Sequence, residues 1–139
     1  MNYDYAYYKK IADFIKAESG GFEPEMGLIL GSGLGGYASS IEKVAEIPYK
    51  EIPNFLVSTA PGHDGRLIFG FAEGRKVVCM SGRFHSYEGY SFEQLALPVR
   101  VMKILGIEIL VLTNAAGAIN ESYDVGDLMI IKDHIKLTG

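Results

Sequence analysis

Apolar side chains recur every three or four positions near the start of the chain. The stripe is formed by Tyr7, Ile11, Phe14 and Ile15. This spacing places them on one face of a helix over about residues 4–18, and Gly20-Gly21 provide a stop signal. The sequence therefore predicts a helix that packs against a core.

Short runs of apolar residues predict strands along the rest of the chain. They cover residues 26–30, 67–71, 76–80, 108–113 and 128–131. The second and third runs flank Glu73-Gly74, a pair that favours a tight turn and hence an antiparallel hairpin. The leucine-rich, β-branched run over 108–113 is typical of a buried strand.

A glycine-rich turn and a proline-bearing segment separate the first strand from the hairpin. The glycines at 31–36 lead into a brief helix over about residues 37–43. Prolines then keep the chain extended up to a glycine-flanked loop at 61–65. These prolines are Pro48, Pro53 and Pro61.

Another helix is predicted between the hairpin and the 108–113 strand. Ser91 and Gln94 have the spacing of a capping box, and apolar residues then recur at helical spacing until Gly106. Strands mixed with helices in this order indicate an α/β domain with a mixed, twisted β-sheet flanked by helices. We find no internal repeat, low-complexity tract or linker, so we assign all 139 residues to one domain.

Composition narrows the classes of function. A content of 48% hydrophobic residues indicates a globular chain, and a formal net charge of −4 argues against nucleic acid as a partner. The single cysteine, Cys79, lies in an apolar run and suits a reducing compartment. No apolar stretch approaches a membrane span, and the first residues lack a secretory pattern, so we expect a cytoplasmic protein without a membrane partner.

The nine residues 82–90 form the densest group of functional side chains. They place Arg83, His85, Tyr87 and Glu88 within six positions, directly after a predicted strand. Arginine offers a planar fork of donors for an oxyanion, and histidine and tyrosine can donate or accept. In an extended segment Arg83, His85 and Tyr87 share one face, although a turn would spoil the alternation. We interpret the segment as a binding site; the alternative is a solvated arginine and a satisfied or exposed histidine.

Two further groups lie where predicted strands end, at residues 31–36 and 114–117. Residues 31–36 satisfy the G-x-G-x-x-G pattern, which can hold phosphate at a helix start. The context argues against NAD, and the triphosphate P-loop pattern fails because no Lys-Ser/Thr pair follows. A glycine turn needed only for its backbone conformation is the alternative, although Ser32 can still contact a phosphate oxygen.

Other chemistry finds less support in the residues themselves. His63 lies in a glycine-flanked loop, where a lone histidine is usually solvent-exposed. Three histidines and scattered acidic residues provide no closely spaced ligand set, so we predict no metal site. The G-x-S-x-G elbow of hydrolases is absent around Ser32.

Four motifs taken together resemble the trimeric type of purine nucleoside phosphorylase. They are Gly31-Ser-Gly-Leu-Gly35, Pro61-Gly-His-Asp-Gly-Arg66, Gly82-Arg-Phe-His-Ser-Tyr-Glu-Gly89 and Thr113-Asn-Ala-Ala-Gly117. They occur in order, cover nearly the whole chain, and are more specific together than any one alone. The methylthioadenosine phosphorylases are less similar around residues 82–89.

The resemblance implies a reversible phosphorolysis. Inorganic phosphate would displace the base of a purine ribonucleoside or deoxyribonucleoside, giving free purine and (deoxy)ribose 1-phosphate. Ser32, Arg83, His85 and the backbone N–H of Ala115 match the phosphate site of the family, and His63 matches a loop histidine near it. Such donors can replace the lost hydration of a phosphate dianion.

The remaining roles also come from the resemblance. Tyr87 matches a residue against the ribose, and Glu88 matches the carboxylate that orients His85, so His85 and Glu88 are the expected catalytic pair. Substrate-binding positions on the base side are Asn114, Ala116 and Gly117. The family implies a homotrimer that needs no metal or organic cofactor, with phosphate as co-substrate.

Length is where the chain departs from the family, whose members are roughly twice as long. We therefore assign residues 1–139 to the N-terminal half of a single, truncated phosphorylase domain. We expect this half to carry the phosphate site, to be inactive alone, and to associate through uncovered sheet surface. The alternatives are a non-catalytic phosphate-binding fragment or assembly unit, and, last, an unrelated nucleotide-binding module.

Overall fold

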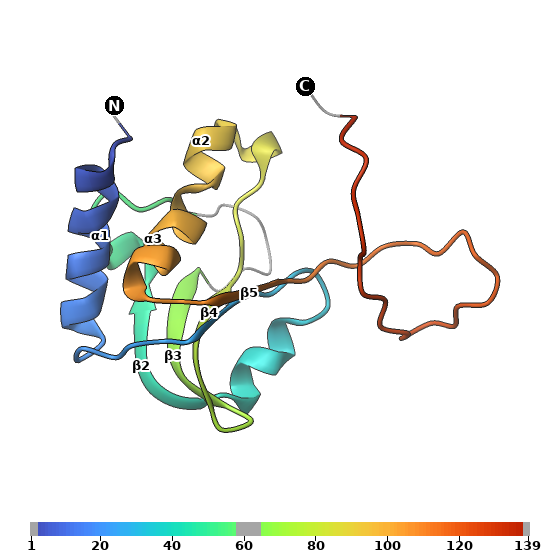
Figure 1. Ribbon diagram of the computed structural model, residues 1–139, viewed down its shortest axis with the longest axis horizontal. Helices are drawn as coiled ribbons and strands as arrows, with labels where there is room; N and C mark the ends of the chain where they lie inside the picture. The colour runs from blue at the N-terminus through green and yellow to red at the C-terminus, as the bar shows by residue number, and fades with distance from the viewer. Residues whose placement is uncertain (1–2, 58–64, 138–139) are drawn as a thin grey trace.

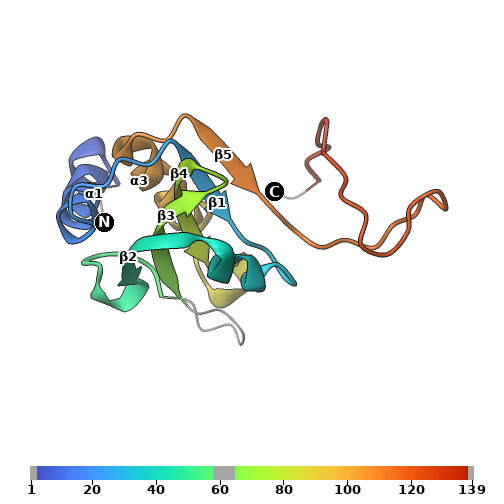
Figure 2. The same ribbon diagram turned by 90° about the horizontal axis from the view of Figure 1, so that it is seen from below.

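A five-stranded sheet with helices packed on it forms the regular part of the computed structural model, which describes residues 3–57 and 65–137 (Figures 1 and 2). The strands are β1 (Met26–Ile29), β2 (Glu42–Pro48), β3 (Arg66–Ala72), β4 (Arg75–Ser81) and β5 (Ile109–Leu112). The α-helices are α1 (Tyr5–Glu18), α2 (Phe92–Leu95) and α3 (Leu97–Leu105). Short 3₁₀ helices are η1 (Gly35–Ser40), η2 (Tyr49–Glu51) and η3 (Ser86–Glu88).

The sheet is mixed, which confirms the predicted α/β class. Its strand order is β2-β3-β4-β1-β5, with β2, β3 and β4 antiparallel and β1 parallel to both β4 and β5. Ile29 at the end of β1 is in register with Met80 of β4 on one side and with Leu112 of β5 on the other. The carboxyl ends of β4, β1 and β5 therefore meet at one edge of the sheet.

Helices α1 and α3 cover one face of the sheet and bury the main core (Figure 1). Asp4 caps α1 by accepting a hydrogen bond from the Tyr7 N–H at 2.9 Å, and Ile11 and Ile15 on its apolar stripe are buried. The stripe meets Phe69 of β3 and Val78 of β4 within one cluster. The predicted packing helix is thus confirmed.

The opposite face of the sheet carries a smaller core beneath η1. Val77 and Cys79 of β4 point there with Ile68 of β3, and they pack with Ala38 and Ile41. Successive β4 residues alternate between the two cores, as the geometry of a strand requires. Both faces of the hairpin strands are therefore covered, and the predicted antiparallel hairpin is confirmed.

The segment after β1 differs from the prediction. A brief helix was expected over about 37–43, but η1 occupies Gly35–Ser40 and residues 42–48 form β2. The strand was missed because its residues before Ile47 are exposed or half-buried, which leaves no apolar alternation to recognise. Its pairing with β3 and the shift in register between Lys43 and Ala45 decide its conformation.

Two later predictions were also wrong in part. Residues 109–112 form β5, yet three of these four residues are exposed, because β5 lies at the edge of the sheet (Figure 2). Residues 128–131 form no strand; residues 114–137 follow an exposed irregular path away from the sheet, where no other described strand can pair with them.

The capped helix after residue 91 is confirmed but divided. Ser91 accepts from the Gln94 N–H and Gln94 accepts from the Ser91 N–H, as a capping box requires. Ala96 separates α2 from α3, and Pro98 lies in the first turn of α3, where a missing N–H costs little. Within the described residues no helix is long and apolar enough to cross a bilayer.

Candidate functional site

The carboxyl ends of β1, β4 and β5 bring together three of the segments singled out in the sequence. β1 leads into Gly31, β4 leads into Arg83, and β5 leads into Thr113. The N–H of Gly31 donates to Thr113 Oγ1 at 2.8 Å, which joins the ends of β1 and β5 directly. These contacts position the main chain from which the side chains of the site extend.

Arg83 connects the end of β4 to the end of β5. Its Nη1 donates to the Thr113 carbonyl oxygen at 3.0 Å, and its Nε donates to His85 Nε2 at 3.2 Å. The guanidinium is partly buried, so its contacts are stronger than those of a fully solvated cation. The prediction that Arg83 and His85 lie on one face is confirmed by this direct contact.

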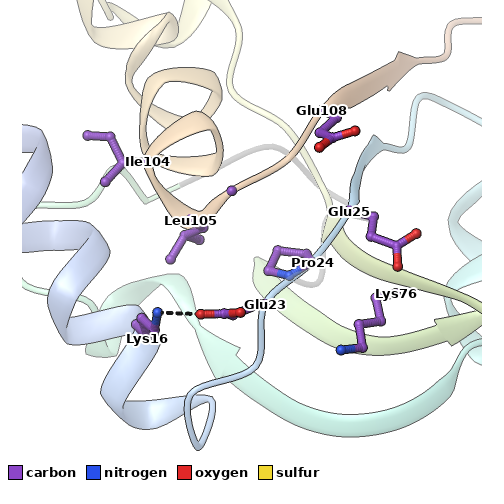
Figure 3. Close-up of a pocket in the computed structure, with 9 residues that line it drawn as sticks. Lys16, Glu23, Pro24, Glu25, Lys76, Ile104, Leu105 and Glu108 are labelled. Carbon is purple, nitrogen blue, oxygen red and sulfur yellow. Dashed lines mark hydrogen bonds and ion pairs between the residues drawn. The ribbon is translucent and has the colours of Figure 1, made fainter.

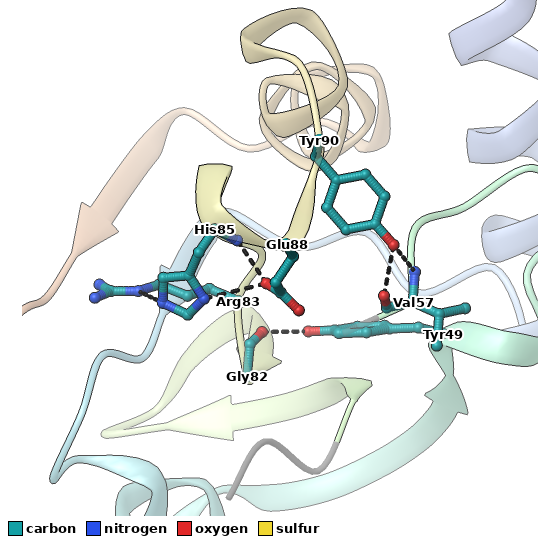
Figure 4. A network of polar contacts seen from close by, with 7 residues as sticks. All are labelled: Tyr49, Val57, Gly82, Arg83, His85, Glu88 and Tyr90. Carbon is teal, nitrogen blue, oxygen red and sulfur yellow. Dashed lines mark hydrogen bonds and ion pairs between the residues drawn. The ribbon is translucent and has the colours of Figure 1, made fainter. Parts of the chain in front are cut away.

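His85 is held between Arg83 and Glu88 (Figure 4). Its Nδ1 lies 3.2 Å from Glu88 Oε2, and its main-chain N–H donates to the same oxygen at 2.7 Å. Because Nε2 accepts from Arg83, the neutral ring carries its proton on Nδ1 and donates it to the carboxylate. The side chain of Glu88 is only 3% exposed, so its oxygens depend on such donors.

The contact between His85 and Glu88 arises from a turn, not from an extended segment. Residues 86–88 form η3, which brings Glu88 back toward His85, and Gly89 ends the turn with φ of 89°, in the left-handed region. Tyr87 stacks on the His85 ring with centroids 4.7 Å apart and the planes at 14°. The phenol itself is largely exposed.

Other predicted site residues are less closely joined. Ser32 is exposed on the turn after β1. Asn114, Ala115, Ala116 and Gly117 follow Thr113 and are exposed, with the Asn114 amide donating to the Ala115 carbonyl at 3.4 Å. His63 lies outside the described residues.

Two tyrosines to which the sequence analysis gave no role hold the segment in place, Tyr49 through Gly82 and Tyr90 through Val57 (Figure 4). The buried Tyr49 hydroxyl donates to the Gly82 carbonyl at 2.7 Å. The Tyr90 hydroxyl donates to the Val57 carbonyl at 2.6 Å. Phe84, between Arg83 and His85, packs against both tyrosine rings. An alternation of side chains in 83–85 could have indicated that Phe84 is buried, but no local signal identifies Tyr49.

A shallow hollow of about 480 Å³ lies at the opposite, amino edge of the parallel strands (Figure 3). Its charged residues include Lys16 and Glu23, which form an ion pair at 2.8 Å, and Glu25, Lys76 and Glu108. None of the predicted site residues lines it. The predicted functional side chains therefore lie at the carboxyl edge and not around this hollow.

Chemically, the carboxyl edge is suited to an oxyanion. It presents a guanidinium, an imidazole and main-chain groups of two strand ends within one cluster. Among the residues that the structure describes, no group of three or more His, Cys, Asp or Glu side chains could hold a metal ion. The predicted cluster around Arg83 and His85 is present in the structure.

Comparison with known proteins identifies what the chain resembles. Residues 25–139 match the family model described as the phosphorylase superfamily. Over 131 residues the chain is 57% identical to purine nucleoside phosphorylase 1 of Geobacillus stearothermophilus, and the match covers 94% of this chain and 47% of that protein.

Solved structures agree with the sequence comparison. A purine nucleoside phosphorylase of Schistosoma mansoni in complex with adenosine is 49% identical with a TM-score of 0.81, and the match covers 91% of this chain and 44% of that chain. A purine nucleoside phosphorylase in complex with ribose 1-phosphate is 49% identical with a TM-score of 0.80, covering 91% and 46%. The chain thus spans about half the length of the relatives it matches.

Proposed function

The chain belongs to the phosphorylase superfamily, and we propose on that premise that it forms the phosphate-binding part of a purine nucleoside phosphorylase. The reaction is the displacement of the base of a purine ribonucleoside or deoxyribonucleoside by inorganic phosphate, which yields free purine and (deoxy)ribose 1-phosphate. The observation that carries the proposal is Arg83, joined to both His85 and Thr113 where three strand ends meet. The ribose 1-phosphate and adenosine complexes of the solved relatives agree with this chemistry.

Phosphate is held by donors of different kinds. Arg83 provides charge, and the Ser32 hydroxyl, the Ala115 N–H and His63 complete the proposed set. To donate to phosphate through Nε2, His85 must carry a proton on both ring nitrogens, and Arg83 Nε, which donates to Nε2 in this structure, must release it and turn to the anion. Glu88, within 3.2 Å of Nδ1, fixes the ring orientation in which this occurs.

The nucleoside lies beside the phosphate in the proposed complex. Tyr87 packs against the ribose, and Asn114, Ala116 and Gly117 contact the purine side. Glycosyl transfer passes through an oxocarbenium-like state, so a phosphate held against the anomeric carbon both stabilises positive charge and attacks. Because Arg83 supplies the positive charge that the dianion needs, the proposed reaction requires neither a metal ion nor an organic cofactor.

Assembly and location belong to the same proposal. We propose a homotrimer that acts in the cytoplasm. Exposed apolar side chains on β5 and beyond favour association. The thiol of Cys79 is buried and unpaired, which suits a reducing compartment.

The proposal is tested by titrating phosphate into the 139-residue chain and its Arg83→Ala variant by calorimetry. We expect the variant to bind phosphate more weakly by about 1.5–3 kcal/mol, the range for a charge-assisted hydrogen bond, which is roughly 10- to 150-fold in affinity. Arg75→Ala is the matched control, since Arg75 is exposed and pairs with Glu25 at the other edge of the sheet. Unchanged phosphate affinity in Arg83→Ala would refute the proposed role.

A second assay separates catalysis from binding. The chain is incubated with inosine and phosphate, and hypoxanthine and ribose 1-phosphate are separated by chromatography. Formation of both products supports a chain that is catalytic by itself. Phosphate binding without products supports a chain that contributes only the phosphate-binding part.

A further inference from the structure

Thr113 contacts the end of β1 and Arg83, and it directly precedes the segment that carries Ala115. Its Oγ1 accepts from the Gly31 N–H at 2.8 Å and donates to the Ile29 carbonyl at 3.2 Å. Its own N–H donates to the same Ile29 carbonyl at 3.1 Å. The Thr113 side chain thereby binds both Ile29 and Gly31, the residues that lead from β1 to Ser32.

The main chain of Thr113 completes this arrangement on the other side. Its carbonyl oxygen accepts from Arg83 Nη1 at 3.0 Å. The Thr113 peptide therefore lies between the β1 turn and the guanidinium, and residues 114–117 leave from the same point. A change in how Thr113 sits would displace Ser32, Arg83 and Ala115 relative to one another.

The approach of the two strand ends is unusually close. A Cβ atom added to Gly31 would lie 2.3 Å from the Thr113 carbonyl oxygen and 2.9 Å from Asn114 Cα. Glycine is therefore needed at position 31 for the ends of β1 and β5 to approach this closely. The short distance also explains the threonine, because only a short side chain with a hydroxyl reaches Gly31 N and Ile29 O together, and its β-branch restricts χ1.

We infer that Thr113 is a positioning residue for the phosphate site, an inference that rests on the proposed function. Its hydroxyl holds the turn that carries Ser32 against the end of β5, and its carbonyl holds the guanidinium of Arg83. Thr113 does not itself touch the anion. Its hydroxyl sets the separation between donors that a bound phosphate must span.

Isosteric substitution tests the inference. Thr113→Val keeps the β-branched shape and removes both hydroxyl contacts, whereas Thr113→Ser retains the hydroxyl. By calorimetry we expect Thr113→Val to weaken phosphate binding by roughly five- to tenfold, as for the loss of a neutral hydrogen bond that orders a site. Thr113→Ser keeps the hydroxyl, so its phosphate affinity should stay within about twofold of the wild type.

A destabilised but correctly arranged protein serves as the control. Ser91→Ala removes the cap of α2, away from the strand ends, and should leave phosphate affinity unchanged while lowering stability. If Thr113→Val loses phosphate affinity and Ser91→Ala does not, the loss comes from displaced phosphate donors and not from a less stable fold. Wild-type affinity in Thr113→Val, or a loss that serine does not restore, would overturn the inference.

A further measurement covers the case in which Thr113→Val fails to fold. In the wild type, amide hydrogen exchange at Gly31 should slow when phosphate is added, because binding stabilises the arrangement that protects this N–H. Exchange that phosphate leaves unchanged would contradict the inference. A wild type that binds no phosphate at all would overturn the proposed function and the inference together, whereas binding that ignores the Thr113 hydroxyl overturns only the inference.

Discussion

Tyr49 joins the segment that carries Arg83 to the core through one hydroxyl. The side chain is 1% exposed, and its ring packs against Phe55 and Phe84. The hydroxyl donates to the Gly82 carbonyl, and the Tyr49 N–H donates to the Gly65 carbonyl at 2.8 Å. A buried carbonyl that loses its donor is costly, so this contact should contribute measurably to stability.

Tyr49→Phe removes the hydroxyl and keeps the ring. We expect the free energy of unfolding at neutral pH to fall by about 1–3 kcal/mol, the cost of an unsatisfied buried carbonyl. Desolvation by burial, with a smaller contribution from Cys79, raises the pKa of Tyr49 well above its ordinary value of 10.0. The folded wild type therefore keeps a proton that the unfolded chain releases, so the stability that Tyr49 contributes is present below pH 10.0 and is lost as pH rises through the folded pKa.

The difference between wild type and Tyr49→Phe should consequently shrink above pH 10.0. Urea unfolding at neutral pH and at about pH 11 measures it. Burial also raises the pKa of Cys79 from 9.0 to about 12, but both proteins contain this thiol, so its effect largely cancels. Tyr5→Phe is the control because Tyr5 is exposed. A difference that stays constant across this pH range would contradict the expected titration.

The sequence predicted which residues form the site better than it predicted which of them contact one another. Arg83, His85 and Glu88 were identifiable because charged and polar side chains concentrate after an apolar strand. The family resemblance paired Glu88 with His85, whereas strict alternation of an extended segment would separate them. The 3₁₀ turn η3 brings them to 3.2 Å. Tyr49 could not be recognised, because its role depends on Gly82, which is distant in the sequence.

Among the helices, α2 begins with a capping box formed by Ser91 and Gln94. Ser91→Ala removes the side-chain acceptor of the Gln94 N–H at 3.3 Å, and we expect the free energy of unfolding to fall by about 0.5–2 kcal/mol. Chemical denaturation monitored by circular dichroism measures the change. Ser39→Ala is the matched control, since Ser39 is exposed on η1. Equal stabilities of the two variants would argue that the cap contributes nothing.

Local patterns predicted those elements whose partners are close in the sequence. The β3–β4 hairpin and α1 follow from turn residues, caps and apolar spacing, and both are confirmed. β2 and β5 depend on strands far along the chain. The sequence therefore predicted the end of a helix and an extended segment where β2 forms, and it predicted that β5 is buried. Residues 128–131 have the apolar content of a strand without a described neighbour to pair with.

Taken as a unit, the molecule exposes an apolar edge. Ile109 and Leu112 on β5 are 51% and 65% exposed, and further apolar side chains between 119 and 137 are exposed beyond it. An unpaired apolar edge strand is a surface for association. We therefore expect the purified chain to self-associate, with a mass that rises with concentration in light scattering.

Charge on β5 tests where association occurs. The double variant Ile109→Lys/Leu112→Lys should shift the chain toward monomer, because charged side chains oppose edge-to-edge pairing. Val44→Lys is the control, since Val44 is an apolar residue about as exposed as Ile109 but lies on β2, the strand at the other edge of the sheet. A wild type that is monomeric at every concentration, or a double variant that associates as before, would contradict the prediction.

The central place of β1 also has a consequence for the order of folding. Met26 pairs with Val77 and with Ile109, contacts that close long loops, whereas β3 and β4 are joined by a tight turn. Loop closure of this kind is slow, so the hairpin should acquire protected amides first and β5 last, an order that pulse-labelled exchange during refolding records. Since Gly31, Arg83 and Thr113 meet only once β5 has docked, a bound anion would slow unfolding and leave the folding rate nearly unchanged.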